Sequence, residues 1–157
     1  MVYLVLKFLH VIGAVVLLGT GAGIAFFLLM AHRTGDAAVV AAVVRIVVVA
    51  DFVFTASAVI VQPFTGFLLA RLLGFSLCQG WITLSLLLYL VTGAFWLPVV
   101  GMQMRMRDLT HQAAHAGNPL PPEYHRLFST WFAFGLPAFA AVLAIFWLMI
   151  SKPQIGW

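Results

Sequence analysis

The feature that most restricts the fold of this chain is a set of four long apolar runs. They span residues 2–30, 46–72, 77–104 and 127–150. A helix needs about 20 apolar residues to cross the hydrocarbon core of a bilayer, and each run is at least that long. A segment inside a bilayer must satisfy its own backbone hydrogen bonds, so each run is predicted to be a helix. The chain is therefore predicted to be all-α, an integral membrane four-helix bundle with antiparallel up-down topology.

The composition indicates a single transmembrane domain, residues 1–157, and no separate soluble module. Hydrophobic residues make up 64% of the chain and charged residues only 8%, whereas soluble domains have about 25% charged residues. The net charge of +4 comes from basic residues scattered at the ends of the apolar runs, so we expect no nucleic-acid partner. The single cysteine, Cys78, excludes an intrachain disulfide and a metal site built from several cysteines.

Two segments between the runs are predicted to lie outside the hydrocarbon core. Residues 37–45 follow Asp36, a residue type that favours helix N-caps, and are predicted to form an interfacial segment with Arg45 reaching toward water. Residues 105–126 are polar and contain prolines, and they are predicted to form the one long loop. Pro63, inside the second run, is expected to kink its helix and to leave a carbonyl group for a neighbouring helix to satisfy.

The basic residues predict an orientation in the membrane, because cytoplasmic loops carry an excess of lysine and arginine. The connections after the first and third runs lie on one side of the membrane, and this side carries five arginines: Arg33, Arg45, Arg105, Arg107 and Arg126. The side of the termini carries three basic residues: Lys7, Arg71 and Lys152. This bias predicts the orientation of a multi-pass membrane protein. Residues 31–45 and 105–126 are expected in the cytoplasm, and both termini on the opposite side of the membrane.

His10 is the one histidine within an apolar run, and it is the first candidate for function. Ionisable side chains are costly inside a bilayer and mark functional sites by default. Polar residues at helical spacing mark the inward faces of the helices. Counting about 1.5 Å per residue along each run gives the depth of each polar side chain. The count predicts one level formed by His10, Gln62 and Tyr89, and a second level, about one turn nearer to the termini, formed by Lys7, Thr65 and Ser85.

The imidazole of His10 can ligate haem iron, relay a proton or make a structural hydrogen bond. Small residues such as Gly13 and Gly21 would let a flat porphyrin lie against the first helix. No second histidine lies in an apolar run, so a sixth iron ligand would be absent, of another residue type, or supplied by a second subunit. In the structural alternative, His10 bonds to Tyr89 or Gln62 and locks the bundle.

Two other groups of residues carry weaker signals. His111 and His115 stand at i and i+4, a spacing that can hold a metal, and the methionines at 102, 104 and 106 suit Cu(I). Alternate methionines do not share a helix face, so an amphipathic segment with incidental histidines is the favoured interpretation. Asp51 lies inside the second run. It is predicted to pair with Arg45 or with a backbone group, and a proton-carrying role is the alternative.

Four sequence motifs extend over nearly the whole chain. They are YLVLKFLHVIGAVVLLGTGAG at 3–23, QPFTG at 62–66, WLPVVGMQMRMR at 96–107 and WFAFGLPAF at 131–139. Together and in this order they resemble a family of predicted bacterial integral membrane proteins that is catalogued only as a domain of unknown function. The resemblance implies a four-helix protein of a bacterial inner membrane, whose termini would then lie in the periplasm, and it brings no established activity.

Lys7 and His10, followed by glycines, are similar to the first helix of two further groups. One is the membrane-embedded protoporphyrinogen oxidase family, which binds b-type haem, and the other is the copper-resistance D-type membrane domain. This resemblance implies that Lys7 and His10 match the conserved pair of the oxidase family, with His10 as a haem ligand. The chain lacks the Leu-Pro-Arg that follows in that family, so the resemblance does not extend to oxidase activity.

The sequence thus predicts a small redox-related membrane protein that binds a b-type haem or porphyrin in the bundle interior through His10. One alternative is a cofactor-free interaction or scaffolding subunit of the membrane. A second alternative is a copper- or proton-handling membrane protein. Four helices enclose little interior volume, so a homodimer or a partner membrane subunit is expected.

Overall fold

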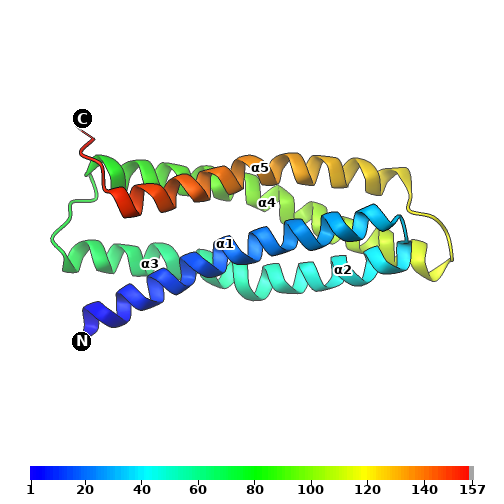
Figure 1. The fold of residues 1–157 in the computed structure, drawn as a ribbon, viewed down its shortest axis with the longest axis horizontal. Coiled ribbons are helices and arrows are strands. Elements are labelled where there is room, and N and C mark those ends of the chain that lie inside the picture. Colours follow the sequence, from blue (N-terminus) through cyan, green and yellow to red (C-terminus); the bar gives the residue numbers. More distant parts are fainter. Residues whose placement is uncertain (156–157) are drawn as a thin grey trace.

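The computed structural model describes residues 1–155 as an all-α membrane four-helix bundle (Figure 1). Its helices are α1 (Val2–Thr34), α2 (Ala37–Ala50), α3 (Ala56–Leu72), α4 (Gly80–His115) and α5 (Pro122–Ser151). One π-helical turn, Asp51–Thr55, joins α2 to α3, so residues 37–72 form one continuous helical span. The resulting four spans are long and apolar enough to cross a membrane, as the apolar runs predicted.

The spans pack in pairs along the length of the molecule. α1 lies beside α2 and α3, and α4 lies beside α5 (Figure 1). The start of α1, the end of α5 and the connection between α3 and α4 lie at one end of the molecule, called the termini end below. The α1–α2 and α4–α5 connections lie at the opposite end, called the loop end.

The helices extend further toward the loop end than the sequence predicted. α1 continues to Thr34, and α4 continues to His115, so the connection before α5 contains only residues 116–121. The prediction of a loop over residues 105–126 was therefore wrong. Arginine, glutamine, methionine and alanine are good helix formers, and no glycine or proline interrupts them between residue 102 and Gly117.

Residues 37–45, predicted as a separate interfacial segment, are the first part of the continuous second span. The span begins at Asp36, whose Oδ1 accepts hydrogen bonds from the backbone N–H groups of Ala38 and Val39 at 2.7 and 3.2 Å. Asp36 is thus the N-cap that the sequence predicted. No glycine or proline follows it before the π-helical turn, so nothing separates this segment from the rest of the span.

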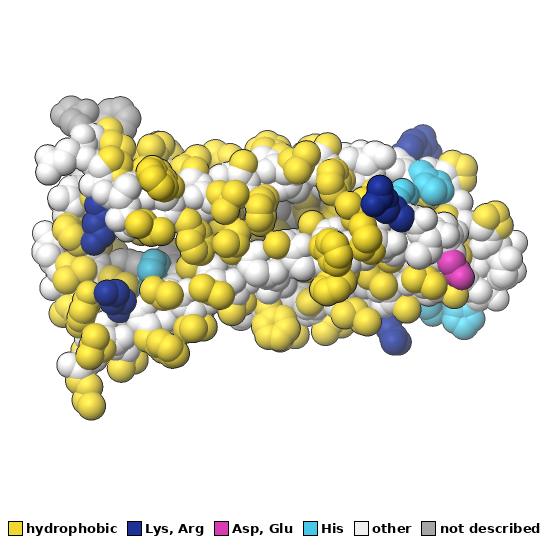
Figure 2. Space-filling view, viewed as in Figure 1, with side chains coloured by type: hydrophobic (Ala, Val, Ile, Leu, Met, Phe, Trp, Pro, Cys, Tyr) yellow, Lys and Arg dark blue, Asp and Glu magenta, His cyan; other side chains and the backbone are white. Residues whose placement is uncertain are grey.

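The hydrophobic core is concentrated at the loop end. Its buried side chains come from α1, α2, α4 and α5, and they include Leu28, Val44, Met106, Tyr124 and Phe128. At the termini end, α3 lies against α1, and α4 lies against α5, whereas α3 and α4 share few contacts in the described residues. Figure 2 shows a hollow at this end, with a histidine and basic side chains around it. The bundle is closed at the loop end and more open at the termini end.

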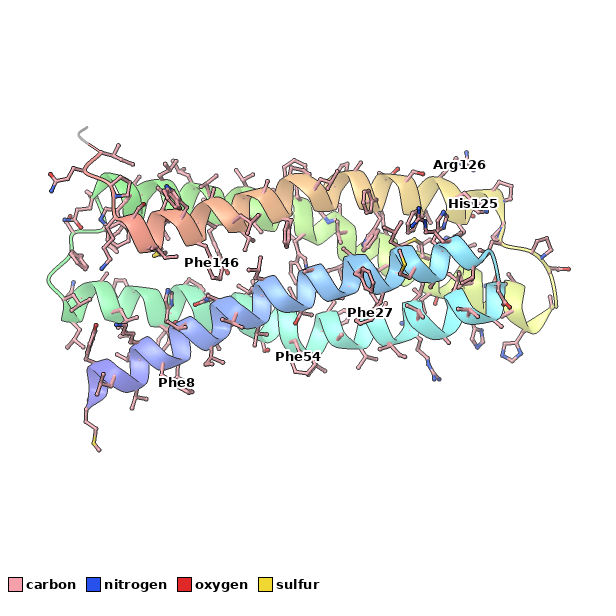
Figure 3. All side chains as sticks on the ribbon, in the orientation of Figure 1. Phe8, Phe27, Phe54, His125, Arg126 and Phe146 are labelled. Carbon is pink, nitrogen blue, oxygen red and sulfur yellow. The ribbon has the colours of Figure 1, made fainter. Side chains whose placement is uncertain are left out.

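Large apolar side chains cover the outside of the bundle. Phe8, Phe27 and Phe54 point away from the helices (Figure 3), and each exposes more than half of its surface. Soluble monomers rarely expose large continuous apolar patches. The lipid bilayer is therefore the partner that covers this surface.

Candidate functional site

His10 of α1 is held against α3 by a hydrogen bond. Its Nδ1 atom lies 2.9 Å from Oγ1 of Thr65. The Thr65 hydroxyl also lies 2.9 Å from the carbonyl oxygen of Val61 and 3.1 Å from that of Gln62, and it has a single hydrogen to donate. Because the hydroxyl donates toward its own helix, it accepts from His10, which makes Nδ1 the protonated ring nitrogen. The lone pair of Nε2 is then available to another partner.

Two glycines let side chains of this site lie directly on the backbone of the opposite helix. A Cβ atom at Gly66 would lie 3.1 Å from Cε1 of His10, and one at Gly13 would lie 3.3 Å from Cδ of Gln62. Both distances are shorter than ordinary contacts between carbon atoms. Glycine at these two positions therefore allows α1 and α3 to approach closely, with His10 and Gln62 filling the space between them.

The side chain of Gln62 contributes an acceptor without a partner. Its Oε1 atom is buried and has no hydrogen-bond partner within residues 1–155. Leaving a buried polar atom unpaired is costly, and such an atom marks a place where a water or a ligand can bind. His10, Thr65 and Gln62, with Gly13 and Gly66, are called the His10 site below.

Lys7 and Ser85, which were also predicted to line the interior, make other contacts. The ammonium group of Lys7 lies 5.7 Å from the centre of the Tyr3 ring. The hydroxyl of Ser85 is buried and donates to the carbonyl of Trp81, in its own helix, at 2.7 Å. Neither side chain is hydrogen-bonded to the His10 site in the described residues.

His10 lies about one helical turn nearer to the termini end, relative to α3, than the sequence predicted. Counting along the apolar runs placed it beside Gln62 and Tyr89, whereas its hydrogen-bond partner is Thr65. The count assumed that every helix starts at one plane and runs parallel to the others. Figure 1 shows that α1 crosses its neighbours at an angle, so equal residue counts do not give equal depths.

Tyr89 is hydrogen-bonded to a backbone carbonyl of α3 and not to His10. Pro63 has no N–H group, so the carbonyl of Val59 loses its partner within the helix. The Tyr89 hydroxyl donates a hydrogen bond to this carbonyl, which confirms the prediction that a neighbouring helix satisfies it. The bond links α4 to α3 at the end of the bundle where these helices otherwise share few contacts.

Replacing Tyr89 with phenylalanine is expected to lower the free energy of unfolding by about 1 kcal/mol, a typical value for an interhelical hydrogen bond in a membrane. The same replacement in a Pro63→Ala background is expected to cost much less, because the alanine N–H gives the Val59 carbonyl a partner within α3. Unfolding of the four proteins in denaturing detergent measures this double-mutant cycle. Equal losses in both backgrounds would contradict the role assigned to the hydroxyl.

A second polar group, called the Asp51 network, lies in the bundle interior. Asp51 is the first residue of the π-helical turn and is only 4% exposed. The indole Nε1 of Trp96 donates to its Oδ1 at 3.3 Å. With the amide oriented to match its neighbours, Gln103 donates to Oδ2 of Asp51 at 3.0 Å and accepts from Nε1 of Trp131 at 3.2 Å. The network thus ties α4 and α5 to the π-helical turn.

Arg45 does not take part in this network, so the predicted pairing with Asp51 is not formed. Arg45 is exposed and lines a surface cavity of about 240 Å³ together with Arg107, Asp108 and His111. Arg107 forms an ion pair with Asp108 at 2.8 Å. Arg45 and Asp51 are not separated by the three or four residues that place side chains on one helix face, which explains why one points outward and the other inward.

His111 and His115 lie together on the exposed face of α4. Their ring centres are 4.4 Å apart, and both side chains are exposed. Within residues 1–155, the structure brings together no group of three or more histidine, cysteine, aspartate or glutamate residues that could hold a metal ion. Met106 is fully buried whereas Met104 is exposed. These methionines therefore face different directions, as their alternate spacing predicted.

The sequence did not reveal an aromatic stack at the loop end. The ring of His32 lies parallel to that of Phe128, with 3.7 Å between their centres. Its Nδ1 atom lies 3.2 Å from the hydroxyl of Tyr124. His32 lies in residues 31–45, which were predicted to lie outside the bundle, so the sequence predicts no packing partner for it. The spacing of Tyr124 and Phe128, four residues apart on one helix face, was the signal that could have shown a shared contact.

The comparison with known protein families agrees with this membrane fold. The family model described as "Predicted integral membrane protein (DUF2269)" matches residues 4–153 of the chain. No curated protein and no solved structure matches the chain. The matched range includes both the His10 site and the Asp51 network. The chain therefore belongs to the DUF2269 family of predicted integral membrane proteins, whose function is unknown.

Proposed function

We propose that this protein is a small redox-related component of a bacterial inner membrane that binds a b-type haem, or a related porphyrin, through Nε2 of His10. The observation that carries the proposal is the hydrogen bond from Nδ1 of His10 to Thr65. Histidines that bind metals commonly donate their other ring N–H to a second group, which fixes the tautomer and the orientation of the ring. His10 has this arrangement, and its Nε2 keeps the lone pair that an iron ion needs.

Three features of the surroundings of His10 support the proposal. The unpaired Oε1 of Gln62 can accept a hydrogen bond from a ligand or from a water beside it. The few contacts between α3 and α4 leave this end of the bundle less filled than the loop end. Lys7 and Lys152 belong to the same end, and their ammonium groups can neutralise the carboxylates that a b-type haem carries.

A bound haem would supply one-electron redox chemistry, which the side chains of this protein do not provide. His10 would supply one ligand to the iron, and Thr65 would orient its ring. A second ligand would come from a second subunit in a homodimer or from a partner membrane protein. The redox potential would follow from the polarity around the ligand and from the bond between His10 and Thr65.

The test is a visible absorption spectrum of the purified protein in detergent after addition of haem. The wild type is expected to show a Soret band, and His10→Ala is expected to lose it. Thr65→Val, which removes only the orienting bond, is expected to weaken haem binding by about 10- to 100-fold. His115→Ala, which removes an exposed histidine, is the matched control and is expected to bind haem like the wild type.

A wild-type protein that stays colourless with added haem would overturn the proposal, and so would an unchanged Soret band in His10→Ala. Size-exclusion profiles and circular dichroism show whether each variant is folded. If His10→Ala is unstable, His10→Gly with free imidazole in the buffer is the substitute. Imidazole is then expected to restore the Soret band.

A cofactor-free interaction or scaffolding subunit is the second candidate function. It is favoured by one observation, that the bond between His10 and Thr65 links α1 directly to α3. In this case the wild type is colourless, and His10→Ala and Thr65→Val lower the thermal stability by similar amounts, because each removes the same bond.

The proposal includes an orientation in the membrane. The loop end carries five arginines: Arg33, Arg45, Arg105, Arg107 and Arg126. The termini end carries three basic residues: Lys7, Arg71 and Lys152. This excess favours a cytoplasmic loop end and periplasmic termini. The His10 site would then lie nearer to the periplasmic surface.

A further inference from the structure

The Asp51 network contains a carboxyl group without a basic partner. Its donors are the indole of Trp96 and the amide of Gln103, neither of which carries a charge. A carboxylate buried in a membrane is usually paired with a cation or takes up a proton. The role of this carboxyl group therefore depends on which charged groups can reach it.

No helix packed around Asp51 brings a titratable side chain to its level. α1 has none between His10 and His32, α4 has none between Tyr89 and Arg105, and α5 has none between Arg126 and Lys152. On its own span, the nearest charged residues are Arg45, which is exposed, and Arg71 at the far end of α3. A charge on Asp51 is thus balanced by no side chain, which leaves a proton as the counter-charge.

Two buried polar atoms without partners lie on the same helix face as Asp51. They are Oγ1 of Thr55, which lies beside the Asp51 carboxyl group, and Oε1 of Gln62, and neither has a partner in good hydrogen-bonding geometry within residues 1–155. Thr55 is one turn from Asp51, and Gln62 is two turns further toward the termini end. Between them on this face lies Ala58, which is small and buried. Water is the group that usually satisfies such atoms in protein interiors.

The other direction from Asp51 is closed by apolar packing. The loop-end core begins beside the network and contains Val47, Val48, Val99, Met106 and Phe128, all buried. Thr110, the polar side chain buried deepest in this part, donates to carbonyl groups of its own helix. A proton that reaches Asp51 therefore has polar groups to follow only toward the termini end.

We propose that Asp51 is an intramembrane proton-binding site that exchanges its proton with water at the termini end, through a file of water molecules along Thr55, Ala58 and Gln62. In this exchange a hydronium ion gives its proton to the carboxylate and leaves as water, and the reverse step returns the proton to water. The site changes its charge by one unit without moving any helix. It does not depend on the cofactor proposed for His10.

The experiment follows the carboxyl C=O band of Asp51 by infrared spectroscopy. Protein labelled with ¹³C in the aspartate carboxyl groups is placed in lipid vesicles, and the spectrum of Asp51→Asn is subtracted. The difference band is expected to appear and disappear reversibly with the pH of the medium. Asp108→Asn removes an exposed carboxyl group and is the matched control, which is expected to leave this band in place.

The path is tested by the rate at which the band shifts after the medium is changed to D₂O. Gln62→Leu and Thr55→Val are expected to slow the shift by about tenfold, because each removes a polar partner from an apolar surrounding. Thr110→Val, which removes a buried hydroxyl on the loop-end side, is expected to leave the rate unchanged.

The proposal is overturned if no band lost in Asp51→Asn responds to pH, or if the band responds to Na⁺ at constant pH. It is also overturned if Thr110→Val slows the exchange while Thr55→Val does not. If Asp51→Asn does not fold, Asp51→Glu replaces it, and a pH-dependent band shifted to the glutamate frequency is the expected result. All these measurements are made without haem, so their failure is distinct from a failure of the haem proposal.

Discussion

Replacing Gln103 with leucine is expected to destabilise the bundle by about 2–4 kcal/mol, because each buried polar group left without a partner costs about 1–3 kcal/mol. The Gln103 amide bonds to Asp51 on one side and to Trp131 on the other. Leucine has a similar volume, so the loss does not come from a cavity. It comes from Oδ2 of Asp51 and the indole N–H of Trp131, which are left unpaired in the interior.

The free energy of unfolding in denaturing detergent, followed by tryptophan fluorescence, measures this loss. Gln112→Leu makes the same chemical change on an exposed face of α4 and is expected to alter stability by less than about 0.5 kcal/mol. Trp131→Phe removes only the outer bond of the network and is expected to cost less than Gln103→Leu. Equal effects of Gln103→Leu and Gln112→Leu would contradict the bridging role of Gln103.

Replacing Gly66 with valine is expected to cost about 1–3 kcal/mol, the usual penalty for added methyl groups in a filled contact, and to displace the imidazole of His10. The first added carbon would lie 3.1 Å from Cε1 of His10, and the two methyl groups add further volume. The ring must move away from α3, so the bond to Thr65 is lost with the close contact of α1 and α3.

Gly21→Val is the matched control, because a Cβ at Gly21 meets nothing within 4 Å. It carries the same change in helix propensity without the collision. The unfolding free energy gives the stability of both variants, and the ¹⁵N NMR shifts of labelled histidine report the hydrogen bond at Nδ1 of His10. A Gly66→Val protein with unchanged His10 shifts would show that the ring does not rest on Gly66.

The sequence predicted the four spans well because membrane insertion depends on apolar length, which can be counted directly. It predicted the helix ends less well. Polar residues such as those from Arg105 to His115 form a helix as readily as a loop, and only the breakers Gly117 and Pro119 decide where that helix stops. The end of a membrane span and the end of a helix are therefore separate features.

The sequence predicted that polar residues lie on the inward faces of the helices, but it did not predict which of these residues contact one another. Asp51, Trp96, Gln103 and Trp131 come from three different spans, and the structure brings these four residues together. Which residues of different inward faces meet depends on helix crossing angles and on the π-helical turn at Asp51, and neither can be read from residue spacing. For the same reason, His10 was placed at the level of Gln62, although it bonds to Thr65.

The unequal packing of the two ends makes the termini end less resistant to local opening than the loop end. α3 is held by its contact with α1, by the π-helical turn and by the hydroxyl of Tyr89. Local openings that break few contacts need far less free energy than global unfolding. An opening between α3 and α4 would therefore break few contacts and would leave the loop-end core intact. A molecule dissolved in the lipid would then reach His10 sideways, between α3 and α4, without passing the polar headgroups.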